Sequence, residues 1–327
     1  MTDETEFQTP RVALVAGVLA VAVAFTFLRT FGGPVLNQLG VAIAESDELW
    51  RYRGLSTLVV LGGGLGALGA AMRFRLEVWQ TNLGWSFRAC SLAVVLAVVA
   101  TSWSGLLAAA FAMGAAAGWV ATTLATGMRA SVGTRRLGIV VGGGLALSSL
   151  LAELAFIMAG WFGDPVKGAA IVIAMLLAAT SVVVPFLTPL EPSMDMEDGY
   201  RGRGLLINWV VMLAVMGSAF AIFNGGGVIP SHGVSIVLNI VTPLVVGRWL
   251  DADHRRYALW AAVSILIVGN ILQNTPGVGA LVPLIAISWM TVIAFHFAAR
   301  GGRVWVAAGT VFLLLFIAPN MVSWFTI

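Results

Sequence analysis

Glu153 is the one acidic residue that lies well inside a long apolar stretch of this chain, between Leu-Ala and Leu-Ala-Phe. Placing a carboxylate inside a membrane is costly, so an acid in such a stretch suggests a functional site. It could bind and release a proton, or act as the counter-ion of a cationic ligand. A structural ion pair buried between helices would explain it equally well, and the residue types alone leave both interpretations open.

Arg29 is a second charge at the end of an apolar stretch, and it is the expected partner of Glu153. Glu153 follows Leu137, where its stretch begins, by 16 residues, and Arg29 follows Val12 by 17. At about 1.5 Å per helical residue, the two side chains should lie at a similar depth. We therefore predict that Arg29 pairs with Glu153.

Three asparagines, Asn208, Asn224 and Asn239, lie in or at the ends of two later apolar stretches. Amide side chains inside membranes often bond neighbouring helices, and they can also bind a polar substrate. All three are candidate substrate or coupling residues. The three histidines are far apart and the chain has a single cysteine, so the sequence predicts no metal site, no disulfide and no cofactor.

The composition defines the class of protein that must position these residues. Of 327 residues, 59% are hydrophobic and only 10% are charged. A soluble domain needs more charge than this to cover its surface, so the sequence indicates an all-α, multi-pass protein of the cell (cytoplasmic) membrane and excludes a soluble enzyme. The arginines are dispersed, which argues against a nucleic-acid partner. The expected partners are the lipid bilayer and a small-molecule ligand.

The apolar stretches predict about eleven transmembrane helices, because one membrane helix needs about 20 apolar residues. The uncharged stretches 89–128, 204–247 and 257–299 are each too long for one helix, so each should hold two, with turns near 102–105, 224–233 and 273–277. The single spans are 12–28, 54–72, 137–162, 168–187 and 304–317, the last extended toward 327. The apolar part of 30–53 either extends the first helix or lies on the membrane surface.

The polar segment 188–204 is expected to be a cytoplasmic linker between a six-helix bundle at 1–187 and a five-helix bundle at 205–327. The basic residues predict the orientation, because cytoplasmic loops carry an excess of Lys and Arg. A cytoplasmic N-terminus places fourteen of the eighteen on that side and Ile327 on the other. The fourteen are Arg11, Arg73, Arg75, Arg88, Arg129, Arg135, Arg136, Arg201, Arg203, Arg248, Arg255, Arg256, Arg300 and Arg303.

Two basic turns occupy corresponding places in the two halves. The second-half turn, at 247–256, reads Gly-Arg-Trp-Leu-Asp-Ala-Asp-His-Arg-Arg, and the first-half turn, at 66–75, keeps small residues and arginines but has no aspartate. This layout resembles the major facilitator superfamily, whose signature Gly-x-x-x-Asp-Arg-x-Gly-Arg-Arg follows its second helix and recurs after its eighth. The candidate gating residues are therefore Arg73, Arg75, Gly247, Arg248, Asp251, Arg255 and Arg256.

The resemblance implies a shortened or divergent secondary transporter, which moves a small molecule by alternating access with Glu153 and Arg29 near the central path. The family has twelve helices and this chain has room for eleven, so the twelfth is lost, lies outside this sequence, or the count is off by one. The weakened first turn and the few charges in the spans favour an alternative, a non-transporting membrane sensor or partner subunit with the same fold. The sequence names no substrate.

Overall fold

The computed structural model describes residues 11–31, 34–44, 49–189, 202–224, 232–252, 255–272, 275 and 281–320, and the regular elements in these ranges are helices. They are α1 (Arg11–Phe31), α2 (Pro34–Ala44), α3 (Leu49–Arg73), α4 (Trp79–Val99), α5 (Trp103–Val132), α6 (Leu137–Ala159), α7 (Pro165–Val183), α8 (Gly202–Asn224), α9 (His232–Asp251), α10 (Arg255–Leu272), α11 (Leu281–Arg300) and α12 (Val304–Val311). Short 3-10 segments at Leu76–Val78, Gly160–Phe162 and Val184–Phe186 flank α4, α6 and α7, and the π-helical segment η5 (Phe312–Ile317) continues α12.

The described helices agree with the expected set of apolar spans. Nine helical segments within the described ranges are long and apolar enough to cross a membrane, and Tyr257–Gly269 and Val304–Asn320 are shorter apolar helices. The predicted turn between the third and fourth spans is also present, because α4 ends at Val99 and α5 begins at Trp103. Ser102 caps α5, since its Oγ accepts from the backbone N–H of Gly105 at 3.2 Å.

The helix α2 resolves one of the alternatives that the sequence left open. Its side chains Val35, Leu36 and Leu39 are buried, and the helix packs against α1, α3, α5 and α7. Together α1 and α2 form one apolar stretch, Arg11–Ile43. The segment after Arg29 therefore continues the first apolar span and packs into the bundle, as the first of the two alternatives expected.

The third span begins earlier than the uncharged stretch 89–128 predicts, and Arg88 lies inside it. The apolar segment is Leu76–Val99, so Arg88 is not part of a polar loop. Its guanidinium stacks over the Trp85 ring, 4.9 Å from the ring centroid, and its Nε donates to Ser181 Oγ on α7 at 3.3 Å. These contacts accommodate a charge that composition alone places outside a span. The predicted orientation counted Arg88 among the loop residues, and the orientation itself remains a prediction.

Glycines allow two helix pairs to pack backbone against backbone. Between α3 and α5, a Cβ added to Gly66 would lie 1.9 Å from the carbonyl oxygen of Ala115, and one added to Gly114 would lie 2.2 Å from that of Val59. Between α6 and α9, a Cβ at Gly142 would lie 2.2 Å from the carbonyl oxygen of Pro243. The glycine triplets at 62–64 and 142–144 thus serve close packing in the membrane. The third triplet, at 225–227, lies outside the described residues.

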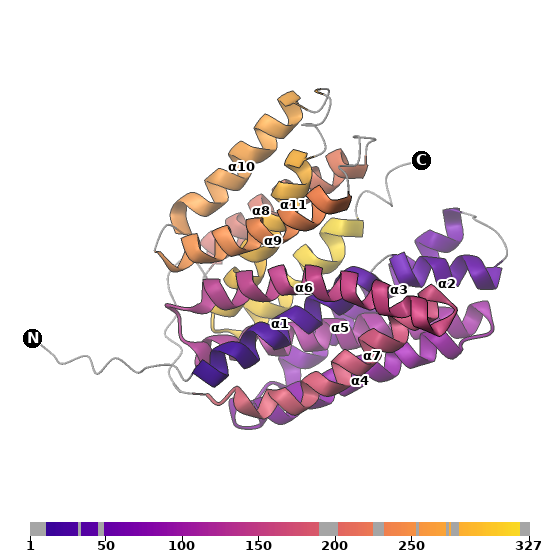
Figure 1. Cartoon of the computed structure of the whole chain (residues 1–327). Helices are drawn as coiled ribbons and strands as arrows, with labels where there is room; N and C mark the ends of the chain where they lie inside the picture. Colours follow the sequence, from indigo (N-terminus) through magenta and orange to yellow (C-terminus); the bar gives the residue numbers. More distant parts are fainter. Residues whose placement is uncertain are drawn as a thin grey trace, which may run out of the picture.

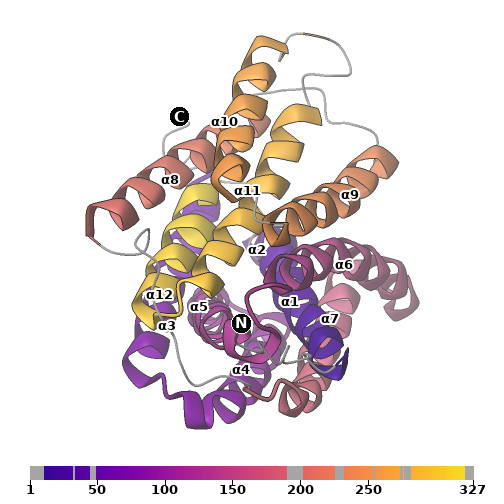
Figure 2. The ribbon, with the colours of Figure 1, turned by 90° about the vertical axis from the view of Figure 1, so that its left-hand side faces the viewer.

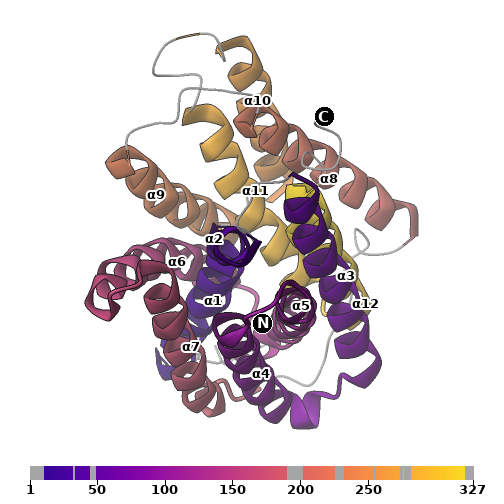
Figure 3. The same cartoon turned by 90° about the vertical axis from the view of Figure 1, so that its right-hand side faces the viewer.

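The helices form two groups that touch along two sides. Helices α1–α7 pack mainly with one another, and α8, α9, α10 and α12 gather around α11 (Figure 1). Figure 2 shows α6 beside α9 on one side and α12 beside α3 on the other, and Figure 3 shows the same pairs from the opposite direction. We call the end where α3 leads to α4 and α9 leads to α10 the signature end. The division at 188–204 stays a prediction, because 190–201 lie outside the described residues.

Candidate functional site

Four helices contribute polar side chains to one cluster in the interior of the bundle, which we call the Arg29 cluster: Arg29 of α1, Ser149 of α6, Asn239 of α9 and Ser288 of α11. The guanidinium of Arg29 donates to Ser149 Oγ through Nη1 and to Asn239 Oδ1 through Nη2, the latter at 3.3 Å. Asn239 Oδ1 also accepts from Ser288 Oγ at 2.7 Å. The cluster therefore links α1 and α6 of the first half to α9 and α11 of the second.

The position of Arg29 follows from the way α1 packs on its neighbours. One turn earlier, Thr26 Oγ1 donates to the carbonyl of Ala22 in its own helix at 2.8 Å and to that of Ser148 in α6 at 3.2 Å. On the other side, Phe25 packs edge-on against Phe295 of α11 with ring centroids 5.1 Å apart. These contacts hold the rotation of α1, so that Arg29 faces the space between the two halves.

The charge of Arg29 is only partly compensated by these neighbours. Its side chain is part-buried and its partners are neutral oxygens. Each hydrogen bond to a charged group contributes about 1.5–3 kcal/mol, and the C-terminal end of α1 adds about 0.3–1 kcal/mol for a cation. Removing an ion from water costs several kcal/mol, and no carboxylate in the described part of the chain is within ion-pair distance of Arg29. Among the described residues, the positive charge of the cluster thus has no counter-charge.

The predicted pair between Arg29 and Glu153 is not formed. Glu153 lies one turn beyond Ser149 on α6, and its Oε2 is 2.9 Å from Nε2 of His232, the first residue of α9. The side chain of His232 is 76% exposed and that of Glu153 is 33% exposed. The prediction rested on the similar depth of the two residues in their helices, and depth does not determine which way a helix is rotated. In the structure, a histidine on α9 lies closer to this carboxylate than the arginine on α1.

The structure places the three candidate asparagines in different surroundings. Asn239 is the central acceptor of the Arg29 cluster. Asn208 lies part-buried on α8, a helix that contributes none of the four cluster side chains. Asn224 ends α8, and its side chain lies outside the described residues. Sequence reasoning missed the two serines of the cluster, because serine is common in membrane helices and carries no distinguishing signal.

At the signature end, Asp251 joins the two halves. Its Oδ1 accepts from the backbone N–H of Gly138 at 2.6 Å, and its Oδ2 accepts from that of Ile139 at 2.7 Å. These N–H groups belong to the first turn of α6, where they have no partner within the helix, and the residue before that turn supplies no side-chain cap. The carboxylate of α9 therefore caps α6, and its charge complements the positive end of that helix.

The other candidate gating residues divide into those that contact the opposite half and those that do not. Gly247 makes a close backbone contact, because a Cβ there would lie 2.3 Å from the carbonyl oxygen of Gly138. Three arginines are exposed at this end: Arg73, Arg75 and Arg248. The last two candidates open α10 and their side chains lie outside the described residues: Arg255 and Arg256.

A further contact at this end was not expected from the sequence. Arg129, in the last turn of α5, donates through Nη1 to the carbonyl oxygen of Arg300 at the end of α11, at 2.9 Å. It is a second link between the halves at the signature end. Both residues were counted only as loop charges in the sequence analysis, since a charge count carries no information about pairing.

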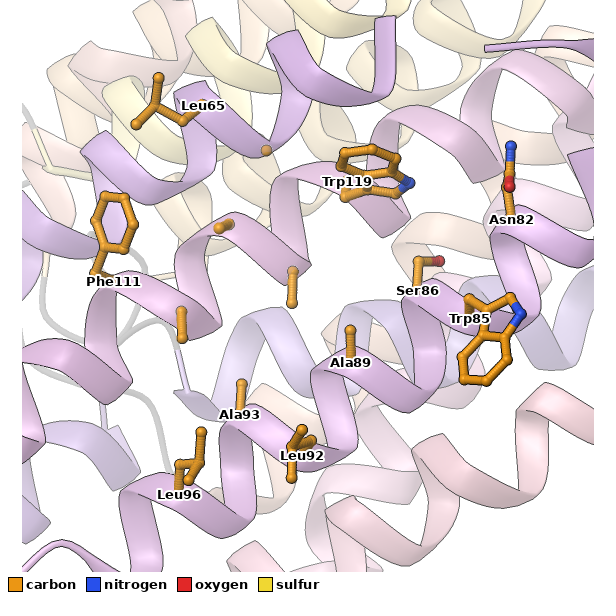
Figure 4. A pocket seen from close by; sticks show the side chains of 14 residues that line it. Leu65, Asn82, Trp85, Ser86, Ala89, Leu92, Ala93, Leu96, Phe111 and Trp119 are labelled. Atoms are coloured by element: carbon orange, nitrogen blue, oxygen red, sulfur yellow. The ribbon is translucent and has the colours of Figure 1, made fainter. Parts of the chain in front are cut away.

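A groove of about 680 Å³ lies elsewhere, on the first half, between α3, α4 and α5 (Figure 4). Its lining is almost entirely apolar and includes Leu65, Leu92, Phe111 and Trp119. Such a surface suits hydrocarbon and offers little to a polar solute. No group of three or more His, Cys, Asp or Glu that could hold a metal occurs in the described ranges. The Arg29 cluster is therefore the better candidate for a site that handles a polar ligand.

The arrangement of the helices is similar to that of solved transporter structures. FucP, a major facilitator transporter in the outward conformation, superimposes with a TM-score of 0.66 and 11% identity over 95% of this chain and 90% of that chain. The human organic anion transporter MFSD10 superimposes with a TM-score of 0.57 and 16% sequence identity, over 96% of this chain and 91% of that chain. The proton:xylose symporter XylE superimposes with a TM-score of 0.56 and 15% sequence identity, over 96% of this chain and 87% of that chain. No family model and no curated protein matches the sequence.

The bundle of apolar helices defines a polytopic, all-helical membrane protein. Within that class, the order and packing of the helices are those of the major facilitator superfamily, and the chain has the fold of that superfamily. The resemblance that rested on the two basic turns is thereby confirmed at the level of the fold. At these sequence identities the likeness says nothing further about the ligand.

Proposed function

We propose that this protein is a secondary transporter that moves a small polar solute through alternating access of the two helix groups. The observation that supports it most is the Arg29 cluster, in which one charged and three neutral polar side chains from both halves meet inside an apolar bundle. A polar site at the junction of two halves is where transporters of this architecture bind their substrates.

The named functions of the structural neighbours support transport without selecting a substrate. They include a proton:xylose symporter, a nucleoside transporter, a peptide transporter and an organic anion transporter. Sugars, nucleosides, peptides and organic anions are therefore the solute classes to test first. In this proposal Asp251 and Gly247 hold the signature end closed while the Arg29 cluster is open to the other side.

A second candidate function is a non-transporting sensor or partner subunit with the same fold. One observation favours it: the contact between α3 and α12 has no counterpart of the Asp251 cap. Helix α3 ends at Arg73 without a carboxylate, and the N-terminus of α12, after Arg303, has no side-chain cap. In the described residues, one helix at the signature end is capped by a carboxylate of the other half, and this asymmetry gives weaker support for a state that is closed at this end. It could bind a ligand and remain in one conformation.

Measured distances at the two ends distinguish these functions without knowledge of the substrate. Spin labels at Arg136 and Arg248 report the signature end, and labels at Phe162 and Val234 report the opposite end, in a Cys90→Ser background reconstituted in lipid. A transporter shows two populations at each end, which change in opposite directions. A single population at both ends that no solute class changes argues for the second function.

Uptake by proteoliposomes then tests transport directly with the four solute classes. The expected result is uptake of at least one class, reduced several-fold by Ser149→Ala. The matched control is Ser91→Ala, because Ser91 lies on α4, outside the cluster, and donates to the carbonyl of Ala174 at 2.8 Å. Equal loss in both variants would show that the serine effect is a general packing effect.

A further inference from the structure

We propose that the solute is an oxyanion, a small molecule with a carboxylate or phosphate group, and that Arg29 binds this group. The proposal rests on the proposed transport function and names the substrate class of the same site. It is based on three features of the Arg29 cluster: the missing negative charge, the unused hydrogen-bond donors, and the pairing of the nearest acid with another residue.

The first feature is the charge. Arg29 meets two neutral oxygens, one from each half of the molecule, and its side chain keeps part of its surface exposed. A charged ligand can therefore reach it. A guanidinium inside a membrane protein requires an opposite charge to offset its desolvation, and the described residues provide none within ion-pair distance. An anionic solute would supply that charge.

The second feature is the balance of donors and acceptors. Asn239 Oδ1 already accepts from Arg29 and Ser288, and the hydroxyl of Ser149 points to the backbone carbonyls of Leu145 and Asn239. These two acceptors of the cluster are thus occupied, and the hydroxyl of Ser288, which donates to Asn239, is buried. What remains are donors: the other N–H groups of the guanidinium and the amide N–H₂ of Asn239. A site with free donors selects a ligand rich in acceptors, and a planar guanidinium matches the paired oxygens of a carboxylate or phosphate.

The third feature is the position of the nearest acid on α6. Glu153 is one turn from Ser149 and would be the natural internal counter-ion, as the sequence analysis expected. In the structure its carboxylate is paired with His232 of α9. The histidine thereby pairs with the acid on α6 that lies nearest to the cluster among the described residues and leaves the guanidinium to the ligand.

Thermal unfolding of the purified full-length chain in detergent tests the proposal with pairs of probes of equal shape. Acetate is compared with acetamide, succinate with succinamide, and inorganic phosphate with the neutral solutes xylose and uridine. We expect at least one oxyanion to raise Tm while its neutral counterpart does not. Arg29→Gln should weaken that binding about 10- to 100-fold, as the loss of charge-assisted hydrogen bonds predicts. Arg29→Lys should keep part of it.

Arg88→Gln is the matched control, because Arg88 is also an arginine within a span but stacks on Trp85, outside the cluster. It should leave the anion-dependent shift unchanged. A measurement without ligand provides the second criterion: Arg29→Gln should raise Tm of the free protein, because the variant no longer holds an uncompensated charge. A lower Tm, with no oxyanion shift in the parent chain, would make Arg29 a structural cross-link and overturn the proposal.

The outcomes also separate this proposal from the transport function on which it rests. Uptake of xylose or uridine that persists in Arg29→Gln would overturn the oxyanion proposal and leave transport intact. An oxyanion-dependent Tm shift that requires Arg29, together with one fixed conformation at both ends, would support the anion site and overturn transport.

Discussion

Two of the contacts between the halves, α6 with α9 and α3 with α12, occupy corresponding places in the layout but differ in chemistry. At the α6–α9 contact, backbones touch at glycines, and polar contacts run from Asp251 at the signature end to Glu153 near the other. At the α3–α12 contact, aromatic rings of the π-helical segment cover glycines of α3, and Ala67, Ala71 and Ala308 form a small apolar cluster.

This difference shows how the two contacts can respond to movement. The α6–α9 contact consists of close backbone contacts at glycines and of a carboxylate cap, and both fit in one helix register only. It should therefore be either fully formed or fully separated. Side-chain contacts of rings and methyl groups can be exchanged for similar ones as helices slide, so the α3–α12 contact should tolerate small displacements. We infer that a rigid contact and an adaptable contact hold the same two groups of helices.

The largest effect is expected from a methyl group placed in the rigid contact. In Gly142→Ala the new Cβ would lie 2.2 Å from the carbonyl oxygen of Pro243, a backbone atom that cannot rotate away. Overpacking of this kind should lower the free energy of unfolding by about 2–3 kcal/mol, measured by denaturation in mixed micelles. At the adaptable contact, the Cβ of Gly64→Ala would lie 2.8 Å from the ring of Phe312, which can turn, so the loss should be smaller.

The control for this prediction is the next residue in the same helix. In Gly143→Ala the nearest heavy atom to the new Cβ is a methyl carbon of Val18 at 3.6 Å, an ordinary contact. This variant should be neutral or gain up to about 1 kcal/mol from better helix propensity. Equal losses at positions 64 and 142 would remove the distinction between an adaptable and a rigid contact.

The second prediction concerns the cap at the signature end. Asp251→Ala removes the acceptors of two backbone N–H groups in α6 and should cost about 1–2 kcal/mol of stability, measured in the same way. The distance between labels at the signature end should shift toward the open population. Arg73→Ala is the control, since Arg73 is an exposed arginine at the same end and carries no label. An unchanged distance distribution in Asp251→Ala would show that the cap does not hold this end closed.

The helices of this fold could be predicted from the sequence because the signals are local. The length of an apolar run, the turn near 102–105 and the paired basic turns each depend on a few neighbouring residues. The glycines of 138–144 are equally plain in the sequence. Their partners on α9 were not predicted, since which helix faces which depends on the packing of the whole bundle.

The candidate site was predicted only in part, for a physical reason. Arg29 and Asn239 were selected because polar groups inside a membrane are costly, and that cost is readable from composition. Their contact was not predicted, because it depends on helix rotation and on residues that are 210 positions apart. Arg88 was misplaced for a related reason: Ser181, its partner, lies 93 positions away and makes a charge acceptable within the span.

The third prediction concerns the N-terminus of α12, a helix of the adaptable contact. Helix α12 begins after Arg303, whose backbone is extended as a cap residue requires but whose side chain makes no cap bond. Arg303→Ser would supply that acceptor and remove a positive charge from the positive end of the helix, so stability should rise by about 0.5–1 kcal/mol. Arg303→Ala separates the two terms, because it removes the charge without adding the acceptor. A gain no larger for serine than for alanine would show that the cap contributes nothing.

The smallest effect is expected at the end of the rigid contact opposite the signature end, where its side chains are more exposed. The pair of Glu153 and His232 spans α6 and α9 as Asp251 does, but the side chain of His232 is 76% exposed. With the imidazole protonated this contact is an exposed ion pair; such pairs contribute about 0.2–1 kcal/mol and are screened by salt, so His232→Gln should lose less than about 1 kcal/mol, and 1 M salt should abolish the difference. Asp251→Ala should retain its loss at the same salt concentration, because its bonds to backbone N–H groups are not an exposed ion pair. If His232→Gln lost more stability than Asp251→Ala, the main polar contribution to the α6–α9 contact would come from the Glu153–His232 pair. The assignment of that role to Asp251 would then be wrong.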